Sequence, residues 1–197
     1  MTKINWERRR KAETSLAAWV RTYCIGLLLD DEPPKKGDEV LEDMEKAITS
    51  HRNFMVCLHR GAGKSSYTLC TTLFAALTGL QKFIVIVSNN ARAASGLLND
   101  LWRAFQETDT ALAQDYPVAL LPFHLCGGSY RRKQTYRGRP TDIQKNAGNI
   151  VLARLKDDDG KEYETSGSVI TARGITSGIR GLKHGTMRPT MVILDDL

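Results

Sequence analysis

The stretch that decides the fold of this chain is FMVCLHRGAGKSS, residues 54–66. It opens on an apolar run, residues 55–58, of the kind that forms a buried parallel strand. It then turns through Gly61 and Gly63 into residues 65–77, where apolar side chains recur at helical spacing. Such a turn aims backbone N–H groups at one point beside the positive end of a helix dipole. The segment therefore predicts a phosphate-binding loop.

The side chains of this loop match the Walker A motif of nucleotide-binding proteins. Lys64 is expected to reach the β- and γ-phosphates of ATP, and the hydroxyl of Ser65 to bind Mg²⁺. The usual pattern is G-x-x-x-x-G-K-[ST], and Leu58 stands at the place of its first glycine. The competing interpretation is an ordinary glycine-rich turn between a strand and a helix. The predicted nucleotide contacts are Arg60, Gly61, Ala62, Gly63, Lys64, Ser65 and Ser66.

A second motif lies in MVILDDL, residues 191–197. Residues 191–194 predict another buried strand, and Asp195 and Asp196 follow at its end, as in a Walker B motif. Asp195 is placed to hold Mg²⁺, mostly through water, and Asp196 to orient and deprotonate the attacking water. Alone this pattern is weak, because many strands end in an acidic turn. An upstream phosphate loop makes a P-loop NTPase the leading interpretation.

Two segments carry a family resemblance: HRGAGKSS, residues 59–66, and GITSGIRGLKHGTMRPTMVILDDL, residues 174–197. Together they resemble the N-terminal ATPase domain of the large terminase subunit of tailed bacteriophages, which packages DNA into an empty capsid. In that family the phosphate loop lacks its first glycine and carries an arginine where Arg60 stands. An Arg-Gly pair precedes the acidic strand, as Arg180 and Gly181 do here. Most members have Glu where this chain has Asp196.

The resemblance implies an α/β fold of the ASCE type of P-loop NTPase, a parallel sheet flanked by helices and incomplete at its C-terminal side. Residues 1–37 are then an N-terminal helix and linker, and residues 38–197 a partial ATPase domain without the nuclease domain. It implies Mg²⁺-dependent ATP hydrolysis that drives double-stranded DNA, in the cytoplasm of the bacterial host. The implied protein partners are the small terminase subunit, the portal protein and further copies in a ring.

The resemblance also assigns roles to arginines. It places Arg60 at the γ-phosphate, and it implies a second arginine from a neighbouring subunit, for which Arg180, Arg131 and Arg132 are candidates. An arginine at the transferred phosphoryl group is worth about 10³–10⁵ in kcat. For Arg180 the alternative is a structural role in a glycine-rich loop. The predicted catalytic residues are Arg60, Lys64, Arg180 and Asp196.

A basic segment, SYRRKQTYRGRP, spans residues 129–140. Phosphate-binding cations interleaved with tyrosines are typical of a nucleic-acid surface. A solvated basic loop has the same composition, and both interpretations stay open. The run ERRRK, residues 7–11, is expected to be a solvated helix face, and the alternative is a contact with DNA or a neighbouring molecule. The candidate DNA contacts of the basic segment are Arg131, Arg132, Lys133, Arg137 and Arg139.

Periodicity predicts the remaining elements, and their strand–helix alternation predicts a parallel sheet. Residues 156–167 between the last two strands predict a hairpin connection. The expected elements are helix 6–29, linker 30–37, helix 39–49 capped by Asp38, helix 65–77 ended by Gly79, strand 83–87, helix 91–108, and strands 150–155 and 168–172.

Composition sets outer limits on function. The 197 residues suit one domain of 42% hydrophobic and 25% charged residues, and the net charge of +6 suits a phosphate-bearing partner. The four cysteines lack metal-ligand spacing, and Cys57 and Cys70 are expected to be core thiols. No apolar run has the length of a membrane span, and no signal peptide is predicted. Two alternatives remain: a helicase-like or DNA-repair P-loop ATPase, and an inactive fragment that binds DNA or a partner.

Overall fold

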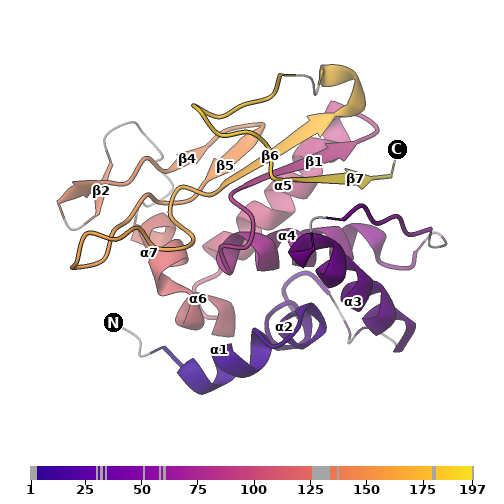
Figure 1. Ribbon diagram of the computed structural model, residues 1–197, viewed down its shortest axis with the longest axis horizontal. Coiled ribbons are helices and arrows are strands. Elements are labelled where there is room, and N and C mark those ends of the chain that lie inside the picture. The colour runs from indigo at the N-terminus through magenta and orange to yellow at the C-terminus, as the bar shows by residue number, and fades with distance from the viewer. Residues whose placement is uncertain are drawn as a thin grey trace.

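The chain forms an α/β fold in which helices pack against a five-stranded mixed sheet (Figure 1). The computed structural model describes all residues except 1–3, 30, 32, 34, 51, 58, 60, 126–133, 137, 179–180 and 197. The helices are α1 (Trp6–Ala12), α2 (Leu16–Tyr23), α3 (Lys35–Thr49), α4 (Lys64–Leu77), α5 (Ala91–Gln106), α6 (Ala111–Asp115) and α7 (Pro117–Leu125). The strands are β1 (Phe83–Ser88), β2 (Thr135–Tyr136), β3 (Arg139–Pro140), β4 (Gln144–Lys145), β5 (Asn149–Val151), β6 (Val169–Gly174) and β7 (Met191–Asp195).

The sheet has the strand order β4-β5-β6-β1-β7. Its centre is parallel as predicted, since β1 runs parallel to both β6 and β7. At the other side β5 runs antiparallel to β6. The predicted hairpin connection explains this reversal, because residues 152–168 fold back on themselves with an antiparallel bridge between Lys156 and Glu162. That connection turns tightly where the amide of Gly160 donates to the carbonyl of Asp157.

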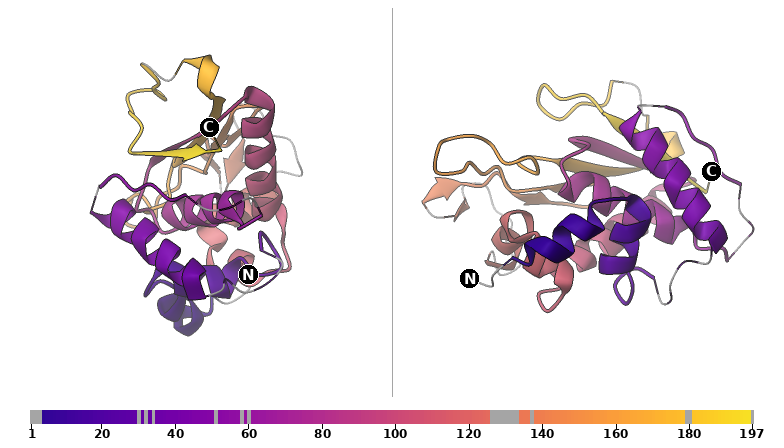
Figure 2. Two further views of the ribbon diagram at one scale, coloured as in Figure 1. Left: turned by 90° about the vertical axis from the view of Figure 1, so that its right-hand side faces the viewer. Right: turned by 60° about the horizontal axis from the view of Figure 1, so that its bottom comes forward.

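The two faces of the sheet are covered differently (Figure 2). Alternate residues of β1 point to opposite faces, so Ile84 and Ile86 join the large core formed with the helices. Phe83, Val85 and Val87 join a smaller cluster on the other face, against Leu182 and Met187 of the segment before β7. Helices thus cover one face, and connecting segments cover the other.

Strand β7 lies at the end of this sheet, and its burial differs from the prediction. Met191 and Ile193 pack against the helix-side core. Val192 and Leu194 pair in register with Val85 and Val87 but are 50% and 60% exposed. The prediction of a strand is confirmed, whereas the prediction that both of its faces are buried is wrong.

The single helix predicted over residues 6–29 is wrong. Helix α1 ends at Ala12, and α2 begins after Ser15, whose side chain accepts a hydrogen bond from the amide of Ala18. A serine that caps the backbone in this way favours a helix start over a helix interior. Helix α2 in turn ends at Tyr23.

Helix α3 begins at Lys35, four residues before the predicted start at residue 39, so residues 35–37 of the predicted linker belong to the helix. Asp38 therefore lies in its first turn and is not the cap. Its carboxylate pairs with Arg21 of α2, which gives the residue a tertiary partner that no local pattern could reveal.

Three predicted elements agree closely with the structure. Helix α4, strand β1 and helix α5 have the expected positions, and Gly79 follows α4 with φ 74°. Helices α6 and α7 were not predicted. Within α7 the described side chains of Leu120, Pro122 and Phe123 are buried.

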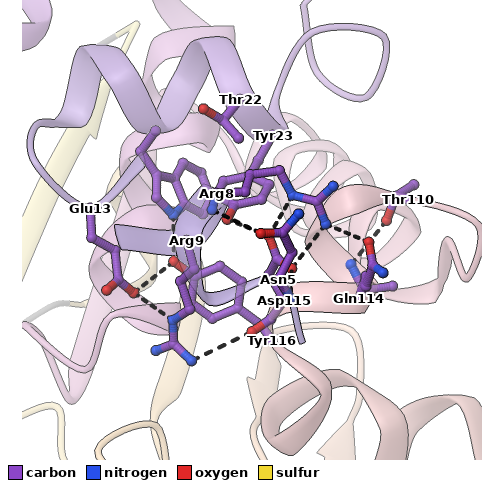
Figure 3. Close-up of polar contacts among 12 residues, drawn as sticks. Asn5, Arg8, Arg9, Glu13, Thr22, Tyr23, Thr110, Gln114, Asp115 and Tyr116 are labelled. Atoms are coloured by element: carbon purple, nitrogen blue, oxygen red, sulfur yellow. Dashed lines mark hydrogen bonds and ion pairs between the residues drawn. The ribbon is translucent and has the colours of Figure 1, made fainter. Parts of the chain in front are cut away.

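The prediction of a solvated face for residues 7–11 is confirmed for Glu7, Arg10 and Lys11, which are exposed, and is wrong for Arg8 and Arg9, which are half-buried. Arg8 makes a two-pronged contact with the fully buried carboxylate of Asp115, at 2.6 Å from Nε to Oδ2 and 2.9 Å from Nη2 to Oδ1 (Figure 3). The same carboxylate accepts hydrogen bonds from the hydroxyl of Tyr23 and the amide of Asn5. The Arg9 guanidinium lies 4.4 Å from the centre of the Tyr116 ring. This network fastens α1 and α2 to α6.

Candidate functional site

The strand predicted over residues 55–58 is wrong. Residues 52–57, all of them described, form no strand, and Met55 is 87% exposed. Cys57 is exposed rather than a core thiol, whereas Cys70 of α4 is fully buried. An apolar run becomes a strand only when a neighbouring strand accepts its backbone hydrogen bonds. No such ladder forms here within the described part of the segment.

The glycine-rich turn after this segment leads into α4 as predicted. Gly61 and Gly63 have φ of 84° and 76°, a conformation that favours glycine, and Gly63 is the N-cap of the helix. The amide of Ala62 donates to the carbonyl of His59 over 3.3 Å. The ammonium of Lys64, the first residue of α4, donates to the same carbonyl over 3.2 Å. The side chain of Lys64 therefore folds back over the turn toward His59.

The end of β7 meets the start of α4. The hydroxyl of Ser65 donates to Oδ2 of Asp195 over 3.0 Å, although the two residues are 130 positions apart. One helical turn further on, the hydroxyl of Thr68 donates to Oδ1 over 3.1 Å. Asp195 is 5% exposed, and Ser65 is exposed. The fold thus joins the two predicted metal-binding residues at one point.

Thr68 is a residue of this site that the sequence did not reveal. It follows Ser65 by three positions, which places both on one face of a helix. That spacing is the only signal that points to it, and it becomes informative only once β7 is known to lie beside that face.

The donors around Asp195 are electrically neutral. Both are hydroxyl groups, and none of the ion pairs formed among the described residues includes Asp195. Hydroxyl and carboxylate oxygens are the ligands that Mg²⁺ prefers. No group of three or more His, Cys, Asp or Glu residues that could hold a metal exists within the described ranges. The oxygen atoms of Ser65 and Asp195 are therefore suitable ligands for Mg²⁺, with water and phosphate as its remaining ligands.

Asp196, the predicted base, follows directly after β7. It is exposed and has φ 53°, a left-handed conformation unusual for a residue other than glycine. No hydrogen bond or ion pair of its carboxylate is found among the described residues. Ser66 of the predicted nucleotide contacts is half-buried in the first turn of α4.

The predicted arginines lie mostly outside the described residues. This holds for Arg60 and Arg180, and for Arg131, Arg132, Lys133 and Arg137 of the basic segment. Arg139 is described, and it is exposed in β3 of the small hairpin formed with β2. Figures 1 and 2 show that hairpin at the opposite end of the molecule from the C-terminus. Arg139 therefore does not join the Ser65–Asp195 contact.

Comparison with known proteins gives no relative: no family model, no curated protein and no solved structure matches this chain. Among the helices that the structure describes, none is long and apolar enough to cross a bilayer.

Proposed function

We propose that this chain is a Mg²⁺-dependent ATPase domain of the P-loop NTPase class, and that it acts as the DNA-packaging motor of a phage terminase large subunit. The observation that carries the ATPase part is the 3.0 Å contact between Ser65 and Asp195. A P-loop NTPase needs one hydroxyl at the start of the loop helix and one carboxylate at the end of a strand, and both must reach the same ion. The terminase part rests on the resemblance of the two motif segments.

In the proposed reaction the loop provides the phosphate contacts. The backbone amides of residues 61–65 and the start of α4 favour negative charge, and Lys64 exchanges the carbonyl of His59 for phosphate oxygens. Ser65 and Asp195 would hold the ion, which would supply positive charge against the negative charge that develops during phosphoryl transfer. Asp196 is the proposed base, and its side chain is exposed directly after β7.

Double-stranded DNA is the proposed partner of the basic segment. Arg139 is exposed there, as a phosphate contact requires. Such contacts are independent of base sequence and weaken steeply with salt, by a slope near 0.9 per phosphate contact. Replacing Arg131, Arg132 and Arg137 by Ala is expected to lower the slope of log K against log salt by roughly 2–3. An unchanged slope assigns the segment to solvent.

The decisive test of the ATPase proposal is nucleotide binding to the Lys64→Ala variant. The substitution removes a charged hydrogen-bond donor to phosphate, so Mg-ATP binding is expected to weaken by about 1.5–3 kcal/mol. Isothermal titration calorimetry measures this directly. The matched control is Lys11→Ala, which removes the same charge from the 80% exposed side chain of α1 and should leave affinity unchanged.

The outcome separates the proposed classes of function. Equal affinity of the wild type and Lys64→Ala contradicts a phosphate loop. Binding of DNA without any binding of nucleotide favours the alternative of an inactive DNA-binding fragment. ATP turnover that is stimulated by single-stranded rather than double-stranded DNA favours the helicase-like alternative.

A further inference from the structure

Asp195 accepts hydrogen bonds from two hydroxyl groups, and only one of them, that of Ser65, belongs to the predicted Walker A motif. Ser65 donates to Oδ2, and Thr68 donates to Oδ1. Thr68 is 4% exposed, so its hydroxyl lies away from solvent while Ser65 lies at the surface. The two donors therefore differ in what else they can bind: Ser65 is open to phosphate and metal, and Thr68 is not.

The hydroxyl of Thr68 also departs from the usual behaviour of threonine in helices. A helical threonine often donates back to the carbonyl four residues earlier. Thr72, the next threonine but one in α4, does so to the carbonyl of Thr68 over 2.8 Å. Thr78, just after the helix, bonds to Phe74 in the same way. Thr68 instead donates across to Asp195, so its hydroxyl is committed to the carboxylate.

We propose that Thr68 is a positioning residue for Asp195, and that it fixes Oδ1 so that Oδ2 stays directed at Ser65 and the phosphate loop. This inference rests on the proposed function. When Ser65 turns a lone pair to a metal ion, its hold on the carboxylate changes, whereas the bond from Thr68 does not involve the metal. A single buried donor on the far oxygen then keeps the carboxylate in place during loading and release of the ion. Partners of this kind contribute about 10–100-fold in metal affinity or activity.

The test compares three substitutions at Thr68 in the full chain. Thr68→Val removes the hydroxyl and keeps the shape, whereas Thr68→Ser and Thr68→Ala differ from each other only by a hydroxyl. Mn²⁺ is the probe, and its affinity in the presence of ADP is measured by electron paramagnetic resonance. We expect Thr68→Val and Thr68→Ala to weaken Mn²⁺ binding by about 10–100-fold, and Thr68→Ser to recover most of it. Binding of ADP without metal is expected to stay at the wild-type level.

Thr71→Val is the matched control. Thr71 is on the same helix and is 2% exposed, but its hydroxyl faces the sulfur of Met44 over 3.5 Å. This variant should bind Mn²⁺ as the wild type does, while thermal melts show the cost of losing a buried hydroxyl from α4. If Thr68→Val does not fold, the Ser and Ala variants carry the comparison.

Each outcome has a definite meaning. Wild-type Mn²⁺ affinity in Thr68→Val or Thr68→Ala overturns the positioning role and leaves the proposed ATPase intact. Equal weakening in the Ser and Ala variants also overturns it, because packing and not the hydroxyl then matters. A wild type that binds no nucleotide overturns both proposals at once.

Discussion

Two buried aspartates in this molecule have opposite surroundings. Asp115 is fully buried, and its carboxylate is paired with the guanidinium of Arg8 and two further donors. Asp195 is almost as buried, but its two donors are the neutral hydroxyls of Ser65 and Thr68. A buried charge is costly unless an opposite charge compensates it. Arg8 provides that opposite charge for Asp115, whereas none of the ion pairs among the described residues includes Asp195.

This difference separates a structural carboxylate from one suited to an added cation. A resident arginine reduces the electrostatic gain that a metal ion would obtain from the carboxylate. Neutral donors keep a carboxylate oriented and leave its charge available. The comparison therefore supports Asp195, and not Asp115, as the ion-binding residue.

The largest expected effect is the loss of ATP hydrolysis in the Asp195→Asn variant. The amide oxygen can accept from one of the two hydroxyls and the amide N–H can donate to the oxygen of the other, but the side chain has no charge for Mg²⁺. A bound metal ion lowers the barrier by several kcal/mol, so steady-state phosphate release should fall by at least about 100-fold. The melting temperature should not fall, because no cation among the described residues loses its partner. A large loss of stability in Asp195→Asn breaks the comparison, since it makes Asp195 a structural residue too.

The opposite pattern is expected at Asp115, where stability is the affected quantity. Asp115→Asn leaves Arg8 without its counter-charge at the junction of α1 with α6. Breaking a buried pair costs about 3–5 kcal/mol, and because Arg8 is 30% exposed we expect about 2–3 kcal/mol in the free energy of unfolding. Urea denaturation measures this loss.

Lys11→Ala is the control for Asp115→Asn. It breaks an ion pair on the same helix, but both partners are about four-fifths exposed, at 80% and 79%. Exposed pairs of this kind contribute about 0–1 kcal/mol. Comparable losses in the two variants contradict the view that the Arg8–Asp115 contact fastens α1 to α6.

An element could be predicted from the sequence where its local pattern and its tertiary burial agree. Helix α4 and strand β1 were predicted because their local patterns and their tertiary burial agree: every residue of β1 and residues 67–77 of α4 are buried. The strand at residues 55–58 was predicted from the same kind of apolar run, but a strand depends on a partner that a local pattern does not contain. The burial of Val192 and Leu194 was wrongly predicted for the same reason, because an apolar run does not distinguish an edge strand from a central one.

The contact between the two motifs could be predicted from the sequence, but the residues that support it could not. Ser65 and Asp195 belong to two motifs whose joint presence implied that they meet, and they do. Thr68 and the Arg8–Asp115 pair have no motif. Their roles depend on long-range contacts, across 127 and 107 positions of the chain respectively. The helix start at Ser15 was missed for a different reason. The apolar residues on both sides of Ser15 follow one helical pattern, and this pattern was given more weight than a single capping residue.

The last and smallest expected effect is on the acid sensitivity of the folded state. Burial alone would raise the pKa of Asp115, but hydrogen bonds from Arg8, Tyr23 and the Asn5 amide, together with the charge of Arg8, lower it below its ordinary value. The unfolded chain then binds the proton more tightly than the folded one, so this carboxylate stabilises the fold above its ordinary pKa of about 3.9. That contribution is lost as the pH falls through the lower pKa of the folded state.

The measurement is the difference in unfolding free energy between the wild type and Asp115→Asn as a function of pH. The difference should be constant from neutral pH to about 5 and should shrink below about pH 4. It should not vanish at once, because a protonated Asp115 still accepts hydrogen bonds from Arg8. Tyr23→Phe removes one of the donors that lower the pKa of Asp115 in the folded state, so in that background the decline should begin at the same pH, be smaller and end at a higher pH. A difference that grows as the pH falls has the wrong sign for a carboxylate stabilised in its charged form, and it would remove the electrostatic basis of the contrast between Asp115 and Asp195.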